Sequence, residues 1–176
     1  DNVILAGNDN SGNVPTSPGA SQPTHGGGYD VFVAKLSSDL KSLKAATYLG
    51  GSGDEIDSEF TLDKSGNVYV TAMTSSDDFP VTKKAFDVTY NGGPTDAFLA
   101  KIDKNLGKLS YATFYGGSDG DEPSSIEVDP SGEAFVAGLT RSSNFPVTES
   151  TIGDPIPAGA AYLMKFDRKG KKLKYS

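Results

Sequence analysis

The feature that most constrains this chain is a repeat with a period of 66 residues. The segment Asp63–Thr82 recurs as Asp129–Thr148, and 8 of the 17 positions from Gly66 onward are identical in the two copies. A second block recurs at the same spacing, because Asp30–Ser52 resembles Asp96–Ser118. Self-similarity at a fixed period indicates an architecture in which each unit packs on its neighbours. We therefore expect each unit to form one structural module.

Short apolar runs between turn residues predict that the chain is all-β. No segment keeps a helical apolar stripe for three turns, whereas β-branched and aromatic runs bounded by Gly, Pro, Asn and Ser recur throughout. The residues Asp129-Pro130-Ser131-Gly132 predict a type I turn with Gly132 at positive φ. Gly66 is also expected at positive φ, in the equivalent turn one unit earlier. Alternate apolar residues before these turns are expected to face neighbouring units: Phe60, Leu62, Ile126 and Val128. Other strands are predicted at 31–36, 43–49, 97–102, 109–115, 161–166 and 173–175.

The two ends of the chain fall within predicted strands. Residues 2–7 align with residues 67–72, which places them on the second strand of a hairpin. We therefore expect an incomplete unit at 1–55, a complete unit at 56–122 and an incomplete unit at 123–176, with roughly three, four and four strands. Such a piece is not expected to close a ring by itself. Further units of a parent chain, or neighbouring chains, are expected to cover its edges.

Composition excludes several classes of function. A formal net charge of −7 and an isoelectric point near 4.6 disfavour binding to nucleic acid or anionic lipid, which requires an excess of Lys and Arg. The chain has no Cys, so neither a disulfide framework nor a thiolate metal site can form. No apolar run approaches the length of a membrane span, so membrane insertion is not expected.

Several motifs together resemble a known family. They are Asp63-Lys64-Ser65-Gly66-Asn67-Val68-Tyr69-Val70, Phe79-Pro80-Val81-Thr82, the segment from Gly92 to Lys101, and Tyr48-Leu49-Gly50-Gly51-Ser52-Gly53-Asp54-Glu55. This combination resembles the SBBP bacterial β-propeller repeat, and residues 15–22 resemble the family's Pro-Thr-x-x-Gly-Ala-x-Gln segment. The third unit departs from the family pattern at 148–151 and 159–161. The resemblance implies four-stranded antiparallel blades in a larger, seven-bladed ring of a secreted or cell-surface protein. It implies no single activity.

Two acidic, Gly-rich loops carry the candidate metal ligands. Carboxylates beside flexible glycine backbone suit an oxygen-ligand site for Ca²⁺. The weak calcium candidates are Asp54, Glu55, Asp121 and Glu122. Neither loop has EF-hand spacing, and short acidic side chains in such turns commonly accept local backbone N–H bonds, so we favour the absence of a cofactor. By the same reasoning Asp30 and Asp96 are expected to cap the preceding Gly-rich turns.

No catalytic residues are predicted. His25 is the only histidine, lies in a loop and does not recur, so we expect it to be solvated rather than the base of a triad. The basic run from Lys165 to Lys174 is expected to be the solvated face of an outer hairpin rather than an anion site. Paired carboxylates for glycosidase chemistry stay open, since only geometry identifies them.

A repeated framework with variable loops favours a non-catalytic binding or assembly scaffold in an extracellular or cell-surface protein. The loops at 8–29, 74–95 and 140–159 diverge most, and they are expected to bind a protein or glycan ligand. One alternative is a propeller-based carbohydrate-active enzyme, a lyase or glycosidase. Another is a surface-layer or filament subunit whose blades pair between chains. These alternatives rest on analogy of fold.

Overall fold

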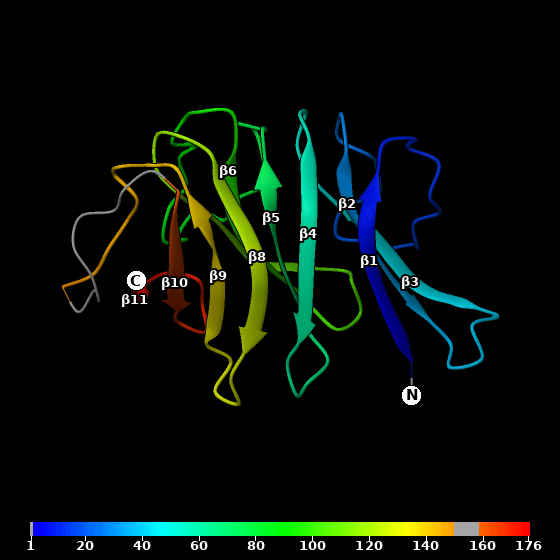
Figure 1. Ribbon diagram of the computed structural model, residues 1–176. Coiled ribbons are helices and arrows are strands. Elements are labelled where there is room, and N and C mark those ends of the chain that lie inside the picture. Colours follow the sequence, from blue (N-terminus) through cyan, green and yellow to red (C-terminus); the bar gives the residue numbers. More distant parts are fainter. Residues whose placement is uncertain (1, 150–158) are drawn as a thin grey trace.

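The computed structural model describes residues 2–149 and 159–176. The regular secondary structure in this part of the chain consists of β-strands alone. The strands form three antiparallel sheets, which we call blades (Figure 1). Blade 1 contains β1 (Val3–Asp9), β2 (Asp30–Leu36) and β3 (Leu43–Leu49). Blade 2 contains β4 (Glu55–Leu62), β5 (Val68–Thr74), β6 (Asp96–Ile102) and β7 (Leu109–Tyr115). Blade 3 contains β8 (Asp121–Val128), β9 (Ala134–Thr140), β10 (Ala160–Phe166) and β11 (Leu173–Tyr175).

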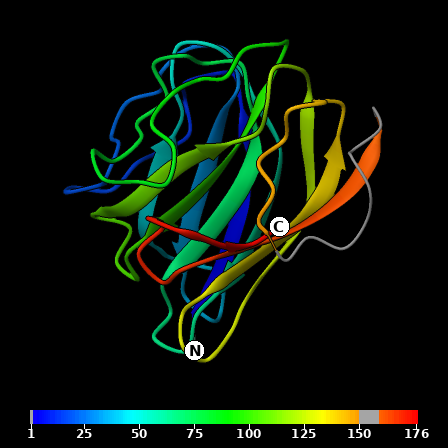
Figure 2. The same ribbon diagram turned by 90° about the vertical axis from the view of Figure 1, so that its left-hand side faces the viewer.

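Each blade is a meander in which consecutive strands are neighbours. The blades stand side by side, with β4 of blade 2 against β8 of blade 3, and Figure 2 views the same array from the side of blade 3. β1 pairs with β2 in the register that β5 keeps with β6, so β1 holds the position of a second strand. The described blades form an open array. The all-β, repeated-sheet architecture is thus confirmed, while the seven-bladed ring stays a prediction.

The predicted strands lie close to the observed ones because their signals are local. Residues 43–49, 109–115 and 173–175 are β3, β7 and β11 as predicted, and the other strands differ by one or two residues at their ends. The hairpin turns are also confirmed, since Gly66 and Gly132 have φ of 81° and 84°. Glycine carries no Cβ penalty in this left-handed region.

The core lies between the blades. Strand side chains alternate between two faces, so successive residues of β5 contribute to different interfaces. The cluster between blades 1 and 2 includes Val31, Val33, Val68, Val70, Phe98 and Phe114. The cluster between blades 2 and 3 includes Tyr69, Leu99, Tyr115, Val136, Met164 and Phe166.

The prediction for the first strand of each hairpin is correct for three of its four residues. Ile126 is buried between blades, and Phe60 and Val128 pack against the two clusters. Leu62 pairs with Val68 on the side of blade 1 but is 42% exposed, so the neighbouring blade does not bury it. Leu62 is the last residue of β4, which has a strand on one side only.

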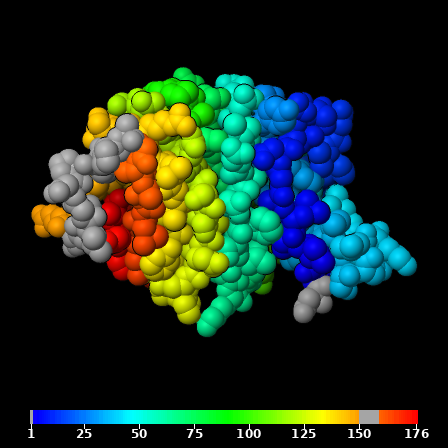
Figure 3. Space-filling view, in the orientation of Figure 1, coloured from blue at the N-terminus to red at the C-terminus, as the bar shows by residue number. Residues whose placement is uncertain are grey.

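The outer faces of blades 1 and 3 leave apolar side chains in solvent. Leu5 on β1 is 39% exposed, whereas Val70, which holds the same position in blade 2, is fully buried. On the opposite side of the array, Leu163 on β10 is 50% exposed, whereas its equivalent Leu99 is fully buried. Figure 3 shows β1 at the molecular surface beside β4. At these positions each outer face therefore matches a face that blade 2 buries.

A turn position with positive φ is filled differently at the two blade junctions. Leu106, between β6 and β7, has φ of 59°, and Gly170, between β10 and β11, has φ of 63°. Leu106 is buried in the cluster that also contains Ala45 of blade 1. A Cβ on Gly170 would lie 2.3 Å from the ring of Tyr111, which holds in blade 2 the register of Ala45 in blade 1. Between blades 1 and 2 the turn residue is large (Leu106) and the strand residue is small (Ala45). Between blades 2 and 3 the turn residue is small (Gly170) and the strand residue is large (Tyr111).

Candidate functional site

A buried carboxylate lies at each junction, which is the place where the chain passes from one blade to the next. Glu55, the first residue of β4, is fully buried and accepts hydrogen bonds from the hydroxyls of Thr74 and Ser76 at 2.6 and 2.7 Å. It also accepts the backbone N–H of Gly51 at 2.8 Å. Thr74 ends β5, whereas Gly51 lies in the turn that leaves blade 1, so the carboxylate joins the two blades. Three donors to one carboxylate are expected to stabilise its position strongly.

The same arrangement recurs one unit later. Asp121, the first residue of β8, accepts hydrogen bonds from the hydroxyls of Thr140 and Ser142 and from the backbone N–H of Gly117. The acidic residue is a Glu in one copy and an Asp in the other, but its three partners occupy equivalent places. The junction is therefore a repeated element of the fold.

A second buried carboxylate faces each of these acids. Asp30 and Asp96 are fully buried, and in both residues Oδ1 has no hydrogen-bond partner in the part of the chain that the structure describes. A Cβ placed on Gly50 would lie 2.2 Å from Glu55 Oε2 and 2.5 Å from Asp30 Oδ1. Glycine leaves this space open, so the two acidic side chains meet there. At the next junction, Gly116 stands in the same way between Asp121 and Asp96.

Burial dominates the titration of these acids. It raises the pKa of Asp30, Glu55 and Asp121, against the lowering effect of the hydrogen bonds that each accepts. Burial raises the pKa of Asp96 to about 7, the backbone N–H of Asn91 opposes the rise, and the charge of Asp121 adds to it. Two facing carboxylates in a buried site disfavour double ionisation, so these pairs hold protons above the pH at which free carboxyl groups lose them.

The four calcium candidates do not converge. Glu55 and Asp121 are buried at separate junctions, whereas the Asp54 carboxylate lies at the surface and accepts the backbone N–H of Tyr29 at 2.9 Å. Glu122 forms an exposed salt bridge with Arg141. Within residues 2–149 and 159–176 there is no group of three or more His, Cys, Asp or Glu that could hold a metal ion. Calcium binding stays a prediction.

The capping role expected of the two strand-initial aspartates is confirmed. Asp30 Oδ2 accepts the backbone N–H of Gly26 at 2.7 Å, and Asp96 Oδ2 accepts that of Asn91 at 2.5 Å. The expectation that His25 is solvated holds only in part, since the residue is half-buried. His25 Nε2 lies 2.9 Å from the carbonyl oxygen of Asp9, and its ring packs edge-on against Tyr48 because the loop folds back over blade 1.

The first two variable loops run along the outer strands of their blades. Ser17 N donates to the carbonyl of Ala46 on β3, and the loop residue Gln22 accepts the N–H of Tyr48. Thr82 N donates in the same way to Ala112 on β7. Part of each loop is therefore committed to covering a sheet edge, which protects it from pairing with another chain. Residues 150–158 of the third loop lie outside the described residues.

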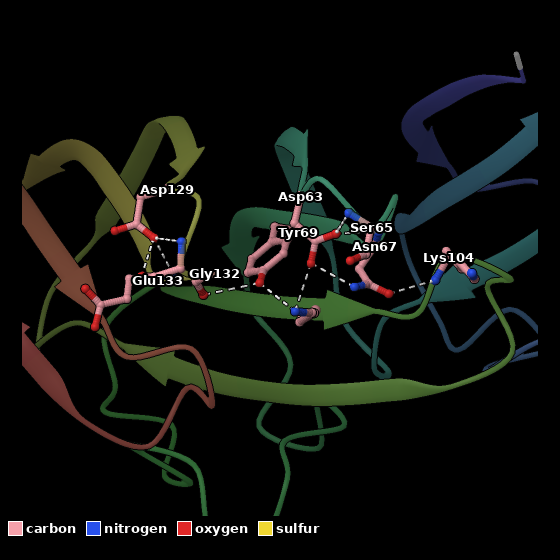
Figure 4. Close-up of polar contacts among 10 residues, drawn as sticks. Asp63, Ser65, Asn67, Tyr69, Lys104, Asp129, Gly132 and Glu133 are labelled. Atoms are coloured by element: carbon pink, nitrogen blue, oxygen red, sulfur yellow. Dashed lines mark hydrogen bonds and ion pairs between the residues drawn. The ribbon is translucent and has the colours of Figure 1, made fainter.

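Sequence reasoning missed the Thr and Ser partners of the buried acids and the contacts that join the blades at their opposite end, although it predicted the turns there. There the β4–β5 hairpin turn is organised by Asp63, whose Oδ1 accepts the N–H groups of Ser65 and Asn67 at 2.9 and 3.0 Å (Figure 4). Asp63 Oδ2 accepts the Asn67 side-chain amide at 2.7 Å. It also forms a salt bridge of 3.1 Å with Lys101 of β6.

This turn is tied to the equivalent turn of blade 3. Lys101 Nζ lies 2.6 Å from the hydroxyl of Tyr69, and that hydroxyl donates to the carbonyl of Gly132 at 3.3 Å (Figure 4). Burial alone would lower the pKa of Lys101, but its hydrogen bonds to Tyr69 and Asp63 raise the pKa above the usual value. Lys101 therefore stays charged and holds two turns together.

Two neighbouring cavities of about 530 and 250 Å³ open between these turns and the β10–β11 turn, and Asn67, Lys101 and Arg168 line both. The basic run predicted to be solvated is divided here. Lys165 and Lys174 form salt bridges with Glu133, while Arg168 lines the cavities. Neither cavity is formed by the three divergent loops.

No helix in the described residues is long and apolar enough to cross a membrane. No curated protein matches the chain. Residues 46–80 match the family described as SBBP, a beta-propeller repeat. This match covers the first junction, including the Gly-Gly turn, Glu55, Thr74 and Ser76, and the same elements recur around Asp121. Over residues 46–80 the chain is therefore similar to the SBBP β-propeller repeat, as its motifs indicated.

Proposed function

We propose that this chain is a non-catalytic β-propeller module that serves as an assembly scaffold in a secreted or cell-surface protein, and that its partner is another blade of the same repeat. The observation that supports the proposal is the exposed face of blade 1. Val3 and Leu5 lie in solvent there, although Val68 and Val70 are fully buried at the same positions of blade 2. The extracellular location is proposed from the family resemblance.

The interfaces within the chain indicate which partner fits. Blade 1 covers the equivalent face of blade 2 with Val31, Val33 and their neighbours. Blade 3 presents that kind of covering face at its outer side, where Leu139 and Leu163 are exposed. Burial of one such side chain stabilises an interface by about 1.5 to 3 kcal/mol. Contact between a blade 3 face and a blade 1 face is head-to-tail, so it can link blades of one long chain or of separate copies.

Edge pairing along the outer strands β3 and β7 is a less favoured mode of assembly. The loops already hydrogen-bond along the outer strands β3 and β7. Free backbone groups are what edge-to-edge pairing needs. We therefore propose that blades associate through their faces, and the surface-layer or filament alternative, if it applies, would use the same contact.

Face-to-face association is tested by blocking each face separately. The mass of the 176-residue chain is measured by light scattering over a range of concentrations, for the wild type, Leu5→Glu and Leu163→Glu. We expect the wild type to associate, each variant to be monomeric, and an equimolar mixture of the two variants to form dimers through the one intact pair of faces. Val88→Glu, at an exposed loop position, is the matched control and is expected to associate like the wild type. A wild-type monomer at all concentrations, or a mixture that stays monomeric, would overturn the proposal.

A further inference from the structure

A strongly basic groove lies between blades 2 and 3. This basic groove is the cavity of about 530 Å³, and its four cationic residues are Lys101, Arg168, Lys169 and Lys171. The described residues that line it include no Asp or Glu. The chain as a whole has a net charge of −7, so this concentration of positive charge is opposite to the character of the protein.

Three of the four cations have no ion-pair partner among the described residues. Lys101 is paired with Asp63, but Arg168, Lys169 and Lys171 form no salt bridge with any described residue. The nearby carboxylate of Asp167 accepts the backbone N–H groups of Lys171 and Lys172 and so organises the turn. Like charges held close together raise the free energy of the unliganded groove, and an anion bound there would relieve this repulsion.

The basic residues are not required by the repeated framework. The turns β6–β7 and β10–β11 keep the same internal hydrogen bonds, from Asp103 to Lys108 and from Asp167 to Lys172. On this alignment the positions of Arg168, Lys169 and Lys171 are held in blade 2 by Lys104, Asn105 and Gly107. The same turn therefore forms with one cation at these positions, and the extra charge is particular to this junction.

One residue of the groove wall carries a buried hydroxyl without a hydrogen-bond partner among the described residues. Tyr111 lines the groove, is 4% exposed, and its hydroxyl has no hydrogen-bond partner in the described part of the chain. Burial raises its pKa, so the hydroxyl keeps its proton. The residue in this register of blade 1 is Ala45, which has no polar group. Buried polar groups are almost always paired, so the orphan phenol marks an incomplete hydrogen-bond network behind the groove, and the hydroxyl itself is shielded from solvent.

We infer that the basic groove binds an acidic polysaccharide through its carboxylate or sulfate groups. Arg and Lys side chains bind such anions through charge-assisted hydrogen bonds, and the guanidinium of Arg168 can do so with two parallel bonds. Asn67 and Ser110, which also line the groove, offer an amide and a hydroxyl to sugar hydroxyl groups. Tyr111 is the single aromatic side chain among the described lining residues. The groove therefore has little apolar surface on which the hydrophobic side chains of a peptide could be buried.

The groove and the exposed face of blade 1 are separate surfaces, since one is lined by residues of blades 2 and 3 and the other belongs to β1. Loss of ligand binding and loss of association are therefore distinguishable in one set of variants.

Binding is measured by isothermal titration calorimetry with oligogalacturonate, which carries carboxylates, and with dextran sulfate; neutral dextran and poly-glutamate are the comparison ligands. We expect one or both acidic saccharides to bind, with an affinity that falls as salt is added, and neutral dextran not to bind. Lys169→Asn combined with Lys171→Gly restores the residues of blade 2 and is expected to weaken binding by about tenfold or more. Lys83→Asn with Lys84→Asn removes the same charge from an exposed loop and is expected to change affinity by less than about twofold.

Tyr111→Phe removes only the buried, unpaired hydroxyl and is expected not to lower the melting temperature, since the hydroxyl has no hydrogen bond to lose. If the double variant at 169 and 171 fails to fold, Arg168→Gln provides the equivalent loss of charge. Absence of binding to both acidic saccharides would overturn the inference, as would equal losses in the two double lysine variants. Tighter binding of poly-glutamate than of either saccharide would overturn the ligand class.

Discussion

Asp96 is the residue through which we expect pH to act most strongly on stability. Its carboxyl group is fully buried and is faced by Asp121 from β8 and by Asp87 and Tyr90 from the adjoining loop. Burial raises its pKa from the ordinary 3.8 to about 7. Between these values the folded chain holds a proton that the unfolded chain has released, so the free energy of unfolding falls as pH rises from about 4 to about 7.

The magnitude follows from the shift. One pKa unit corresponds to about 1.4 kcal/mol, so a rise of about three units corresponds to at most about 4 kcal/mol. Small movements of the blade ends, and water entering between the ionised groups, would reduce this value. We expect about 1 to 4 kcal/mol to be lost by pH 8.

Urea unfolding of the wild type and of Asp96→Asn at pH values from 4 to 8 measures the effect. The asparagine variant cannot ionise, so we expect it to match the wild type near pH 4 and to be more stable by the calculated amount near pH 8. The difference between the two proteins is the informative quantity, because other carboxyl groups titrate in both. Asp77→Asn, at an exposed position, is the matched control. The reasoning would be refuted if the free energies of unfolding of the wild type and Asp96→Asn changed in parallel with pH. It would also be refuted if the wild type became more stable relative to the variant as pH rises.

Three further outcomes are expected. Gly132→Val places a β-branched side chain at φ of 84° and should cost about 1 kcal/mol or more, seen as a lower melting temperature; an unchanged value would contradict the turn assignment. Leu106→Ala removes a fully buried side chain from the interface with blade 1 and should reduce the free energy of urea unfolding by about 2 to 5 kcal/mol, whereas a loss below 1 kcal/mol would show that Leu106 packs loosely. EDTA should leave the thermal unfolding curve unchanged, because Thr, Ser and backbone donors already occupy Glu55 and Asp121; a lower transition temperature restored by Ca²⁺ would support the calcium hypothesis instead.

Most of the fold could be predicted because its signals are local. Strand positions follow from short alternating apolar runs, and the Asp-x-x-Gly turns between them have a definite backbone chemistry. The exposure of Leu62 could not be predicted, because it has no such local signal. Leu62 continues the apolar alternation that begins at Phe60, and no residue near position 62 indicates that its side chain is left exposed.

The sites were predicted only in part because their residues meet across blades. Glu55 stood out as an acid in a Gly-rich loop, but its burial depends on Thr74 and Ser76, which lie a whole hairpin away. The recurrence of Thr-x-Ser at 74–76 and 140–142 is the signal that could have identified these partners. The basic groove combines a turn of blade 3 with Lys101 and Tyr111 from two strands of blade 2. A basic run in the sequence does not reveal that junction.

The exchange of large and small residues at the two junctions limits how this repeat can evolve. A second copy of blade 2 inserted after the first would bring Leu106 onto Tyr111, and the two would overlap. Blade 3 placed directly after blade 1 would set Gly170 over Ala45 and leave a void. Either rearrangement would need a compensating substitution on the facing blade. The blades are similar in backbone but not interchangeable in order, so duplication or loss of a unit is expected to survive only when both sides of a junction change together.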